Sequence, residues 1–124
     1  AAVSLSVGGV GIMTTMLISV NQRIREVGLR KAIGAKNSLI MLQFLVESIF
    51  VTLLGGVIGI IIGIAVTFLA ALIIQKLGYH WPFIVTMSSI LLATGISLLI
   101  GVFFGIYPAR KAAKLNIVEA LRYE

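Results

Sequence analysis

Three long apolar runs dominate the pattern of the chain. The stretches without any Lys, Arg, Asp or Glu are residues 1–22, 48–75 and 77–109. A run of about 18 or more apolar residues without charge is long enough to cross a bilayer as a helix. The pattern therefore predicts an all-α membrane protein with one transmembrane domain over residues 1–124. Its transmembrane helices are expected at about residues 1–21, 48–75 and 86–107.

The second helix is expected to project beyond the bilayer. The apolar pattern begins near Ser38 and ends near Gln75, which at ~1.5 Å per residue spans roughly 57 Å against a hydrocarbon core of ~30 Å. Glu47 is the one acidic residue near a span, and a carboxylate is costly in the middle of a bilayer. It could be an ion-relay carboxylate, but a single acid cannot form a relay across the membrane. We expect Glu47 at the membrane boundary, paired with a basic residue of the preceding segment.

That preceding segment, residues 21–38, is predicted to form a helical hairpin tip. Its apolar positions do not form one stripe, which argues against a plain amphipathic surface helix. We expect an extension of the first helix, a break between Gly28 and Gly34, and a tight return. Gly34 fits a helix C-terminus, and Asn37 or Ser38 could cap the helix that follows.

Two further connecting segments complete the pattern. Residues 76–85 form a loop whose Trp81 is typical of the aromatic belt at a membrane interface. Residues 109–124 form a polar tail, in which Asn116 and Glu119 have the spacing of a capping box. A short helix is therefore expected after Asn116.

Small residues recur every four positions in the second and third helices, on the residues Gly55, Gly59, Gly63, Ser97, Gly101 and Gly105. Such faces could line a pore, but they are also the general solution to close helix contact in lipid. We favour helix packing. A cluster of Gly8, Gly9 and Gly11 in the first helix could admit a neighbour in the same way.

The charge content excludes a soluble domain and indicates the orientation. Only 11% of the residues are charged and 60% are hydrophobic, whereas soluble domains carry about 25% charged residues. Five of the ten basic residues lie in 21–36, one is Lys76, and four lie in the tail at Arg110, Lys111, Lys114 and Arg122. Short basic segments stay in the cytoplasm. This places 21–38 and the tail inside, and the 76–85 loop and the N-terminus outside. The net charge of +6 is then accounted for without nucleic acid as a partner.

No residue set in the sequence supports catalysis, a cofactor site or a metal site. Cysteine is absent, His80 is the one histidine, and the phosphate-binding pattern G-x-x-x-x-G-K-[ST] is missing. We therefore expect a chain that is not an enzyme. It begins at Ala1 inside an apolar run without a basic leader, which suggests part of a larger or split membrane protein.

The hairpin tip combines charged residues with aliphatic ones. It could be merely the solvated loop that sets the topology. However, Val27, Leu29 and Ile33, if exposed beside charges of both signs, would suit a docking element for a soluble partner. We favour docking.

Three stretches carry a resemblance to a known family. They are VGGVGIMTTMLISVNQRIREVGLRKAIGAK at 7–36, QFLVESIFVTLLGG at 43–56 and YPARKAAKLNIVEALRYE at 107–124. With them the chain resembles the MacB/FtsX-like family of ABC transporter permeases, most closely its MacB-like branch. One departure is Asn116-Ile117, where the family commonly has Asp-Pro. Asn keeps the capping role, whereas Ile lacks the preset backbone angle of proline, so we expect a softer helix start.

The resemblance implies four spanning helices with a large extracytoplasmic domain between the first two, so that this chain would supply helices two to four. It also implies a homodimer of permeases, each resting on an ABC ATPase subunit or domain, with a membrane-fusion or adaptor protein as an additional partner. No cofactor is expected on this chain, because ATP-Mg would be held by the ATPase. The ATPase-coupling element maps onto Arg25, Glu26, Gly28, Arg30, Lys31 and Gly34.

The function implied is coupling of cytoplasmic ATP hydrolysis to export across the cell membrane by mechanical transmission, without a substrate path through the bilayer. The substrate expected is a macrolide-like drug, a peptide or another toxic compound. Two alternatives stay open: a lipoprotein-release permease, and a regulator of cell-wall hydrolases like the cell-division permeases, which moves nothing.

Overall fold

The computed structural model describes residues 1–122, without the side chains of residues 117, 120 and 121. The chain forms five helices there: α1 (Ala2–Gln22), α2 (Ile24–Ala32), α3 (Asn37–Lys76), α4 (Met87–Ala113) and α5 (Ile117–Arg122). The last two residues of the expected tail, 123 and 124, lie outside the described residues. The predicted all-helical fold class is confirmed, since three of the helices are long and apolar enough to cross a membrane.

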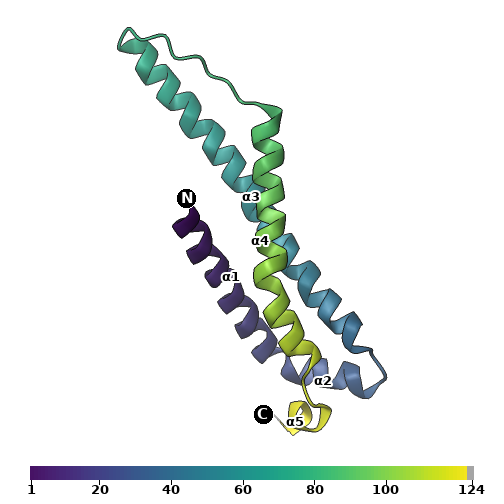
Figure 1. The fold of residues 1–124 in the computed structure, drawn as a ribbon. Helices are drawn as coiled ribbons and strands as arrows, with labels where there is room; N and C mark the ends of the chain where they lie inside the picture. Colours follow the sequence, from purple (N-terminus) through teal and green to yellow (C-terminus); the bar gives the residue numbers. More distant parts are fainter. Residues whose placement is uncertain (123–124) are drawn as a thin grey trace.

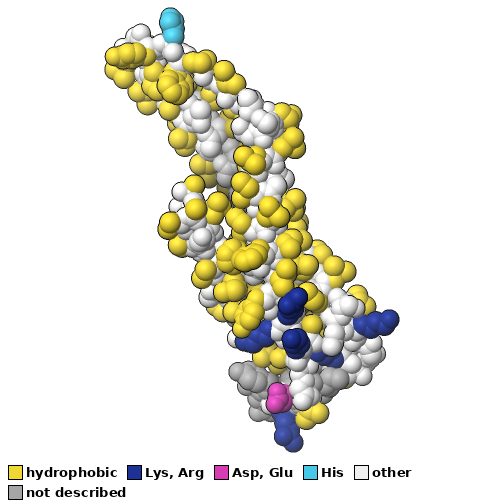
Figure 2. Space-filling model, in the orientation of Figure 1, with side chains coloured by type: hydrophobic (Ala, Val, Ile, Leu, Met, Phe, Trp, Pro, Cys, Tyr) yellow, Lys and Arg dark blue, Asp and Glu magenta, His cyan; other side chains and the backbone are white. Residues whose placement is uncertain are grey.

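The three long helices lie side by side along part of their length (Figure 1). α4 packs against both α1 and α3, and α3 runs obliquely across it. The short helices α2 and α5 lie against each other at one end of the molecule. Lys and Arg side chains gather at that end, while hydrophobic side chains cover most of the remaining visible face (Figure 2). We call it the basic end, and we call the opposite end, with the link between α3 and α4, the far end.

α3 is the longest element, with 40 residues. At ~1.5 Å per residue it measures about 60 Å, so it exceeds a ~30 Å hydrocarbon core as expected. Its far-end half diverges from α4, and an extended link bridges the gap between them (Figure 1). The link turns at Gly78, whose φ of +87° favours glycine because a side chain there would be strained.

The buried core lies toward the basic end. One apolar cluster joins all four of the helices α1 to α4 through Met16, Val20, Val27, Ile40, Phe44, Ala109 and Ala112. By contrast, the far-end half of α3, residues 57–76, has Ala71 as its one buried residue. Since lipid tails are as apolar as these side chains, the exposed far-end faces need no protein cover in a membrane.

The closest contact between α3 and α4 uses glycines of α4 against hydroxyls of α3. A Cβ atom at Gly101 would collide with the Thr52 side chain, and one at Gly105 with Ser48. The Ser48 hydroxyl donates a buried hydrogen bond of 2.8 Å to the Gly101 carbonyl. Close backbone approach and an interhelical hydrogen bond therefore hold this crossing together.

The small-residue faces are used only in part. Ser97 meets α3 at Gly56, where an added Cβ would lie 2.8 Å from the Ser97 hydroxyl oxygen. Gly55, Gly59 and Gly63, predicted for helix packing, have nothing within 4 Å of an added Cβ. Within the described chain, these three glycines therefore make no close helix contact.

In α1, the glycine cluster also contributes one contact. A Cβ at Gly9 would collide with the ring of Phe104 on α4, whereas Gly8 and Gly11 have open space. One glycine of the three therefore admits the neighbouring helix.

Three local expectations differ from the structure. α4 does not end before Pro108 but continues through it to Ala113. Pro108 is fully buried, and helices in membranes tolerate proline where packing compensates for its missing N–H. The start of α3 has no side-chain cap, so neither Asn37 nor Ser38 plays the expected role. The first helix is also interrupted earlier than expected, at Arg23.

Candidate functional site

The candidate site is the helix α2 with the groups that fix it at the basic end. α2 begins after a break of one residue, because Arg23 has φ −106° and ψ 13° and its N–H bonds to the Ser19 and Val20 carbonyls. It ends before a turn that contains Gly34, whose φ of +100° is the left-handed conformation expected for a glycine after a helix. The chain can therefore reverse from α2 into α3 within four residues, 33–36.

An ion pair fixes the start of this hairpin to α3. Arg23 Nη1 lies 3.1 Å from Glu47 Oε2. The expected pairing of Glu47 with a basic residue of the hairpin is therefore confirmed. This ion pair joins the break between α1 and α2 to α3 at the basic end.

A second set of polar contacts runs across the outer side of α2. Arg30 Nη2 lies 2.7 Å from Glu26 Oε1, one helical turn earlier. The other Arg30 nitrogen, Nη1, donates a hydrogen bond to the Gln43 side-chain oxygen on α3. Arg30 thus ties α2 to α3 while its partner Glu26 stays exposed.

Lys31 is turned the opposite way, into the molecule. Its side chain is buried, with a residue exposure of 9%. The ammonium donates hydrogen bonds to the carbonyl oxygens of Ala113 and, at 2.7 Å, of Leu115. Burial lowers the pKa of Lys31 below its ordinary value of 10.5, because removal from water disfavours the charged form.

The residues of the predicted coupling element differ in exposure, and Arg30 is half-buried between an exposed and a buried group. Arg25 and Glu26 are exposed, as is Gly34 in the turn. Gly28 and Lys31 are buried against the rest of the molecule. The first group is thus accessible at the surface of the described chain, and the second packs within it.

The expected aliphatic surface of the hairpin is smaller than predicted. Leu29 and Ile33 are exposed, by 55% and 80%. Val27 is only 3% exposed, so its predicted exposure was wrong. Its position places it in the apolar cluster with Met16 and Val20, which the irregular spacing of the apolar residues did not reveal.

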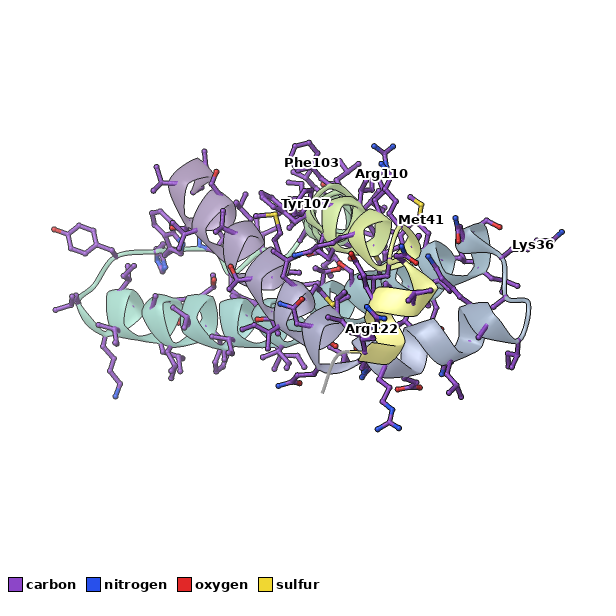
Figure 3. The ribbon with its side chains drawn as sticks, turned by 90° about the horizontal axis from the view of Figure 1, so that it is seen from below. Lys36, Met41, Phe103, Tyr107, Arg110 and Arg122 are labelled. Atoms are coloured by element: carbon purple, nitrogen blue, oxygen red, sulfur yellow. The ribbon has the colours of Figure 1, made fainter. Side chains whose placement is uncertain are left out.

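The tail lies beside α2 and adds further charge. Arg110 and Lys111 are exposed near the end of α4, and Glu119 is exposed on α5. Asn116 accepts a hydrogen bond of 3.2 Å from the Val118 N–H through its side-chain oxygen, the capping role expected for it. Figure 3 views this end from below, with Lys36 at the turn into α3, Arg110 on α4 and Arg122 on α5.

The exposed side of α2 has the character of a surface for contact with a macromolecule. Among the described residues, no group of three or more His, Cys, Asp or Glu side chains could hold a metal ion. An open hollow of about 590 Å³ between α1 and α4 is lined almost entirely by apolar side chains. An exposed helix with charges of both signs and two aliphatic side chains is typical of a protein-binding surface.

Relatives of known description match over nearly the whole chain. The macrolide export ATP-binding/permease protein MacB of Bdellovibrio bacteriovorus is 53% identical over 124 residues, which are 100% of this chain and 18% of the relative. The probable syringafactin export ATP-binding/permease protein SyfD of Pseudomonas syringae is 48% identical over 121 residues, 98% of this chain and 18% of the relative. The ABC transporter permease YknZ of Bacillus subtilis is 48% identical over 124 residues, 100% of this chain and 30% of the relative.

The chain thus spans less than a third of each of these relatives, at 18%, 18% and 30% of their lengths. A family described as FtsX-like permease C-terminal matches residues 1–117. The matched residues include the three long apolar helices and the hairpin formed by α2 and the turn into α3. This multi-pass membrane chain belongs to the FtsX-like permease C-terminal family.

Proposed function

We propose that the chain is the transmission segment of an ABC exporter permease, coupling cytoplasmic ATP hydrolysis to export on the other side of the membrane. The observation that carries this proposal is the construction of α2. Its outer side exposes Arg25, Glu26 and Leu29 to a partner. The helix is also bonded to α3 through the half-buried Arg30 and to the end of α4 through the buried Lys31. A force applied to α2 is thereby delivered to two spanning helices.

The polar groups within the spans favour mechanical transmission rather than a path for a solute through the membrane. Hydroxyls in all three long helices donate to carbonyls of their own helix: Ser6, Thr14, Thr15, Thr67, Thr94 and Ser97. A hydroxyl satisfied in this way is less available to replace the water of a polar solute. A channel for such a solute needs a lining of free polar groups.

The orientation proposed follows from the positive charges at the basic end. With α2 and the tail in the cytoplasm, the N-terminus and the 77–86 link lie outside. The partner at α2 is an ABC ATPase, fused to the permease or separate, and it holds the ATP-Mg. A second permease copy, an extracytoplasmic domain and a membrane-fusion or adaptor protein complete the proposed assembly.

The proposed substrate class is a macrolide-like drug, a peptide or another toxic compound. The names of two relatives, for macrolide export and for probable syringafactin export, support export over hydrolase regulation. They differ in the compound exported although both are about half identical to this chain, at 53% and 48%. We therefore place substrate selection outside residues 1–124.

The test is the Glu26→Ala/Arg30→Ala double variant of the complete permease, assembled with its ATPase in proteoliposomes. It removes an exposed ion pair without changing the net charge. Export of a labelled macrolide should fall at least tenfold while membrane insertion and ATP hydrolysis persist.

The matched control is Lys111→Ala/Glu119→Ala, which removes one charge of each sign from the exposed tail. It should export at the wild-type rate. Wild-type export by the Glu26→Ala/Arg30→Ala variant would refute the coupling role of α2.

A further inference from the structure

Lys31 is buried against the end of α4, so docking of a partner on the surface of α2 does not account for its contacts. Its ammonium bonds to the Ala113 and Leu115 carbonyls, at and just beyond the last residue of α4. The last carbonyls of a helix lack intrahelical partners and carry partial negative charge, so a cation is favourable there. A buried ammonium is otherwise costly. Lysines on the surface of this end, including Lys36 and Lys111, supply positive charge without that cost.

The connectivity of the chain makes this contact distinctive. α2 is joined covalently to α1 at Arg23 and to α3 through residues 33–36. It has no covalent junction with α4, which follows the whole length of α3. Among the described side chains, Lys31 makes the hydrogen bonds that link α2 to the end of α4.

α4 also packs more extensively on the other two long helices than those two pack on each other. It meets α3 where Gly101 and Gly105 face Thr52 and Ser48, and it meets α1 where Phe104 covers Gly9. A displacement of the end of α4 is therefore passed to the two helices packed on it. Interiors packed this closely transmit strain because they have little free space.

We propose that Lys31 is a positioning residue that makes α2 and α4 move as one body, so that an ATPase acting on α2 moves α4 through the Lys31 ammonium. The residue does not contact the ATPase. This inference rests on the proposed function for its consequence in transport, while the joint itself can be measured without it.

The joint is tested in the complete permease with its ATPase in lipid nanodiscs. Spin labels at Leu29→Cys on α2 and Lys111→Cys on α4 report the distance between the two helices. Both side chains are exposed, and residues 1–124 contain no other cysteine. With Lys31 present, the distance distribution should be narrow and equal in the nucleotide-free and ATP-vanadate states.

Lys31→Met removes the ammonium and keeps a side chain of similar length. It should at least double the width of the distribution and make its centre differ between the two nucleotide states. Lys114→Met makes the same charge change at an exposed residue of the same end and should stay narrow. An unchanged distribution in Lys31→Met would overturn the joint.

Where Lys31→Met fails to assemble, Lys31→Gln carries the same test. Its amide is neutral and shorter, so it cannot hold both carbonyls, and it should broaden the distribution in the same direction. In either variant, macrolide export per ATP hydrolysed should fall at least fivefold. A broadened distribution with wild-type export per ATP would overturn the role of Lys31 in transmission.

The two proposals fail separately. A broadened distribution in Lys31→Met, together with wild-type export by Glu26→Ala/Arg30→Ala, would overturn the proposed function and keep the joint. A narrow distribution in Lys31→Met, together with lost export by Glu26→Ala/Arg30→Ala, would overturn the joint and keep the function.

Discussion

The two ends of the helix pair α3 and α4 are built from similar apolar sequence but differ in what holds them. Toward the basic end, Ser48 and Thr52 of α3 are buried against Gly101 and Gly105 of α4. Toward the far end, α3 is exposed along nearly its whole length and α4 has no buried residue before Gly101. Apolar character is common to both ends, so it does not determine where the helices meet. The helices meet where a small residue of one helix is paired with a hydroxyl of the other.

The glycines of α3 make the same point. Gly55, Gly59 and Gly63 repeat every four residues and form the one such face in the chain made of glycine alone. Yet the glycine that meets α4 is Gly56, one position away. Neighbouring residues on a helix point about 100° apart, so a shift of one position moves the contact to another face. The regular face is left open at the surface of α3.

The largest difference in stability between the two ends is expected when a glycine at each end is replaced by a larger residue. Gly101→Leu would place a side chain against Thr52 and 3.2 Å from the Ile49 Cα atom, which is backbone and cannot rotate away. It should destabilise the protein by about 3 kcal/mol, as overpacking of a tight contact does. Denaturation in mixed detergent micelles, followed by circular dichroism, measures this.

The matched variant is Gly59→Leu, which has open space and should change the stability by less than about 0.5 kcal/mol. Equal losses in the two variants would contradict the contrast between the ends. A stable Gly59→Leu chain that no longer forms dimers would show instead that a second copy covers the open face.

A smaller effect is expected from removing one hydroxyl at each end. Ser48→Ala deletes the buried bond to the Gly101 carbonyl and should cost about 1 kcal/mol, typical of interhelical hydrogen bonds in membranes. Thr67→Ala deletes only a bond to the Gly63 carbonyl of its own helix and should be close to neutral. The same denaturation measurement compares them, and a larger loss for Thr67→Ala would reverse the contrast.

The smallest expected effect is a pH dependence that belongs to the basic end. Because burial lowers the pKa of Lys31 in the folded chain, there is a window below 10.5 in which the unfolded chain holds a proton that the native chain has released. Stability rises with pH wherever the unfolded state binds more protons. As the pH rises through this window, the melting temperature of the wild type should therefore increase relative to that of Lys31→Met.

Leu29→Ala is the control for that measurement, since it alters α2 without altering a titratable group. Its melting temperature should follow the wild-type pH curve. Parallel curves for the wild type and Lys31→Met would show that the Lys31 proton is not linked to folding.

The sequence was sufficient for the features that depend on one physical cause. Three runs without charge predicted three long apolar helices, because no soluble arrangement suits such runs. Glu47 was expected beside a basic residue because an unpaired carboxylate is costly near lipid, and it lies 3.1 Å from Arg23. Asn116 was recognised as a cap from local spacing alone.

The sequence was insufficient where the outcome depends on which way a residue faces. Val27 and Lys31 were expected on the surface of the hairpin, but they lie one turn apart on the buried side of α2. The buried side of α2 could not be predicted because the break at Arg23 changes the direction in which the following side chains point. Nothing in the local sequence indicates that the helix breaks at this residue. The third helix was expected at about residues 86–107, yet α4 continues through the buried Pro108 to Ala113.

The oblique crossing of α3 over α4 has a mechanical consequence. Taking Thr52, which faces Gly101 at the crossing, as the pivot, α3 has 15 residues on the basic side, 37–51, and 24 on the far side, 53–76. At ~1.5 Å per residue, the two arms measure about 23 Å and about 36 Å. A rigid α3 turning about this fulcrum would multiply a displacement at the basic end by about 1.6 at the far end. In such a turn, the position of the contact between Ser48 and Thr52 of α3 and Gly101 and Gly105 of α4 would set the ratio of the two displacements.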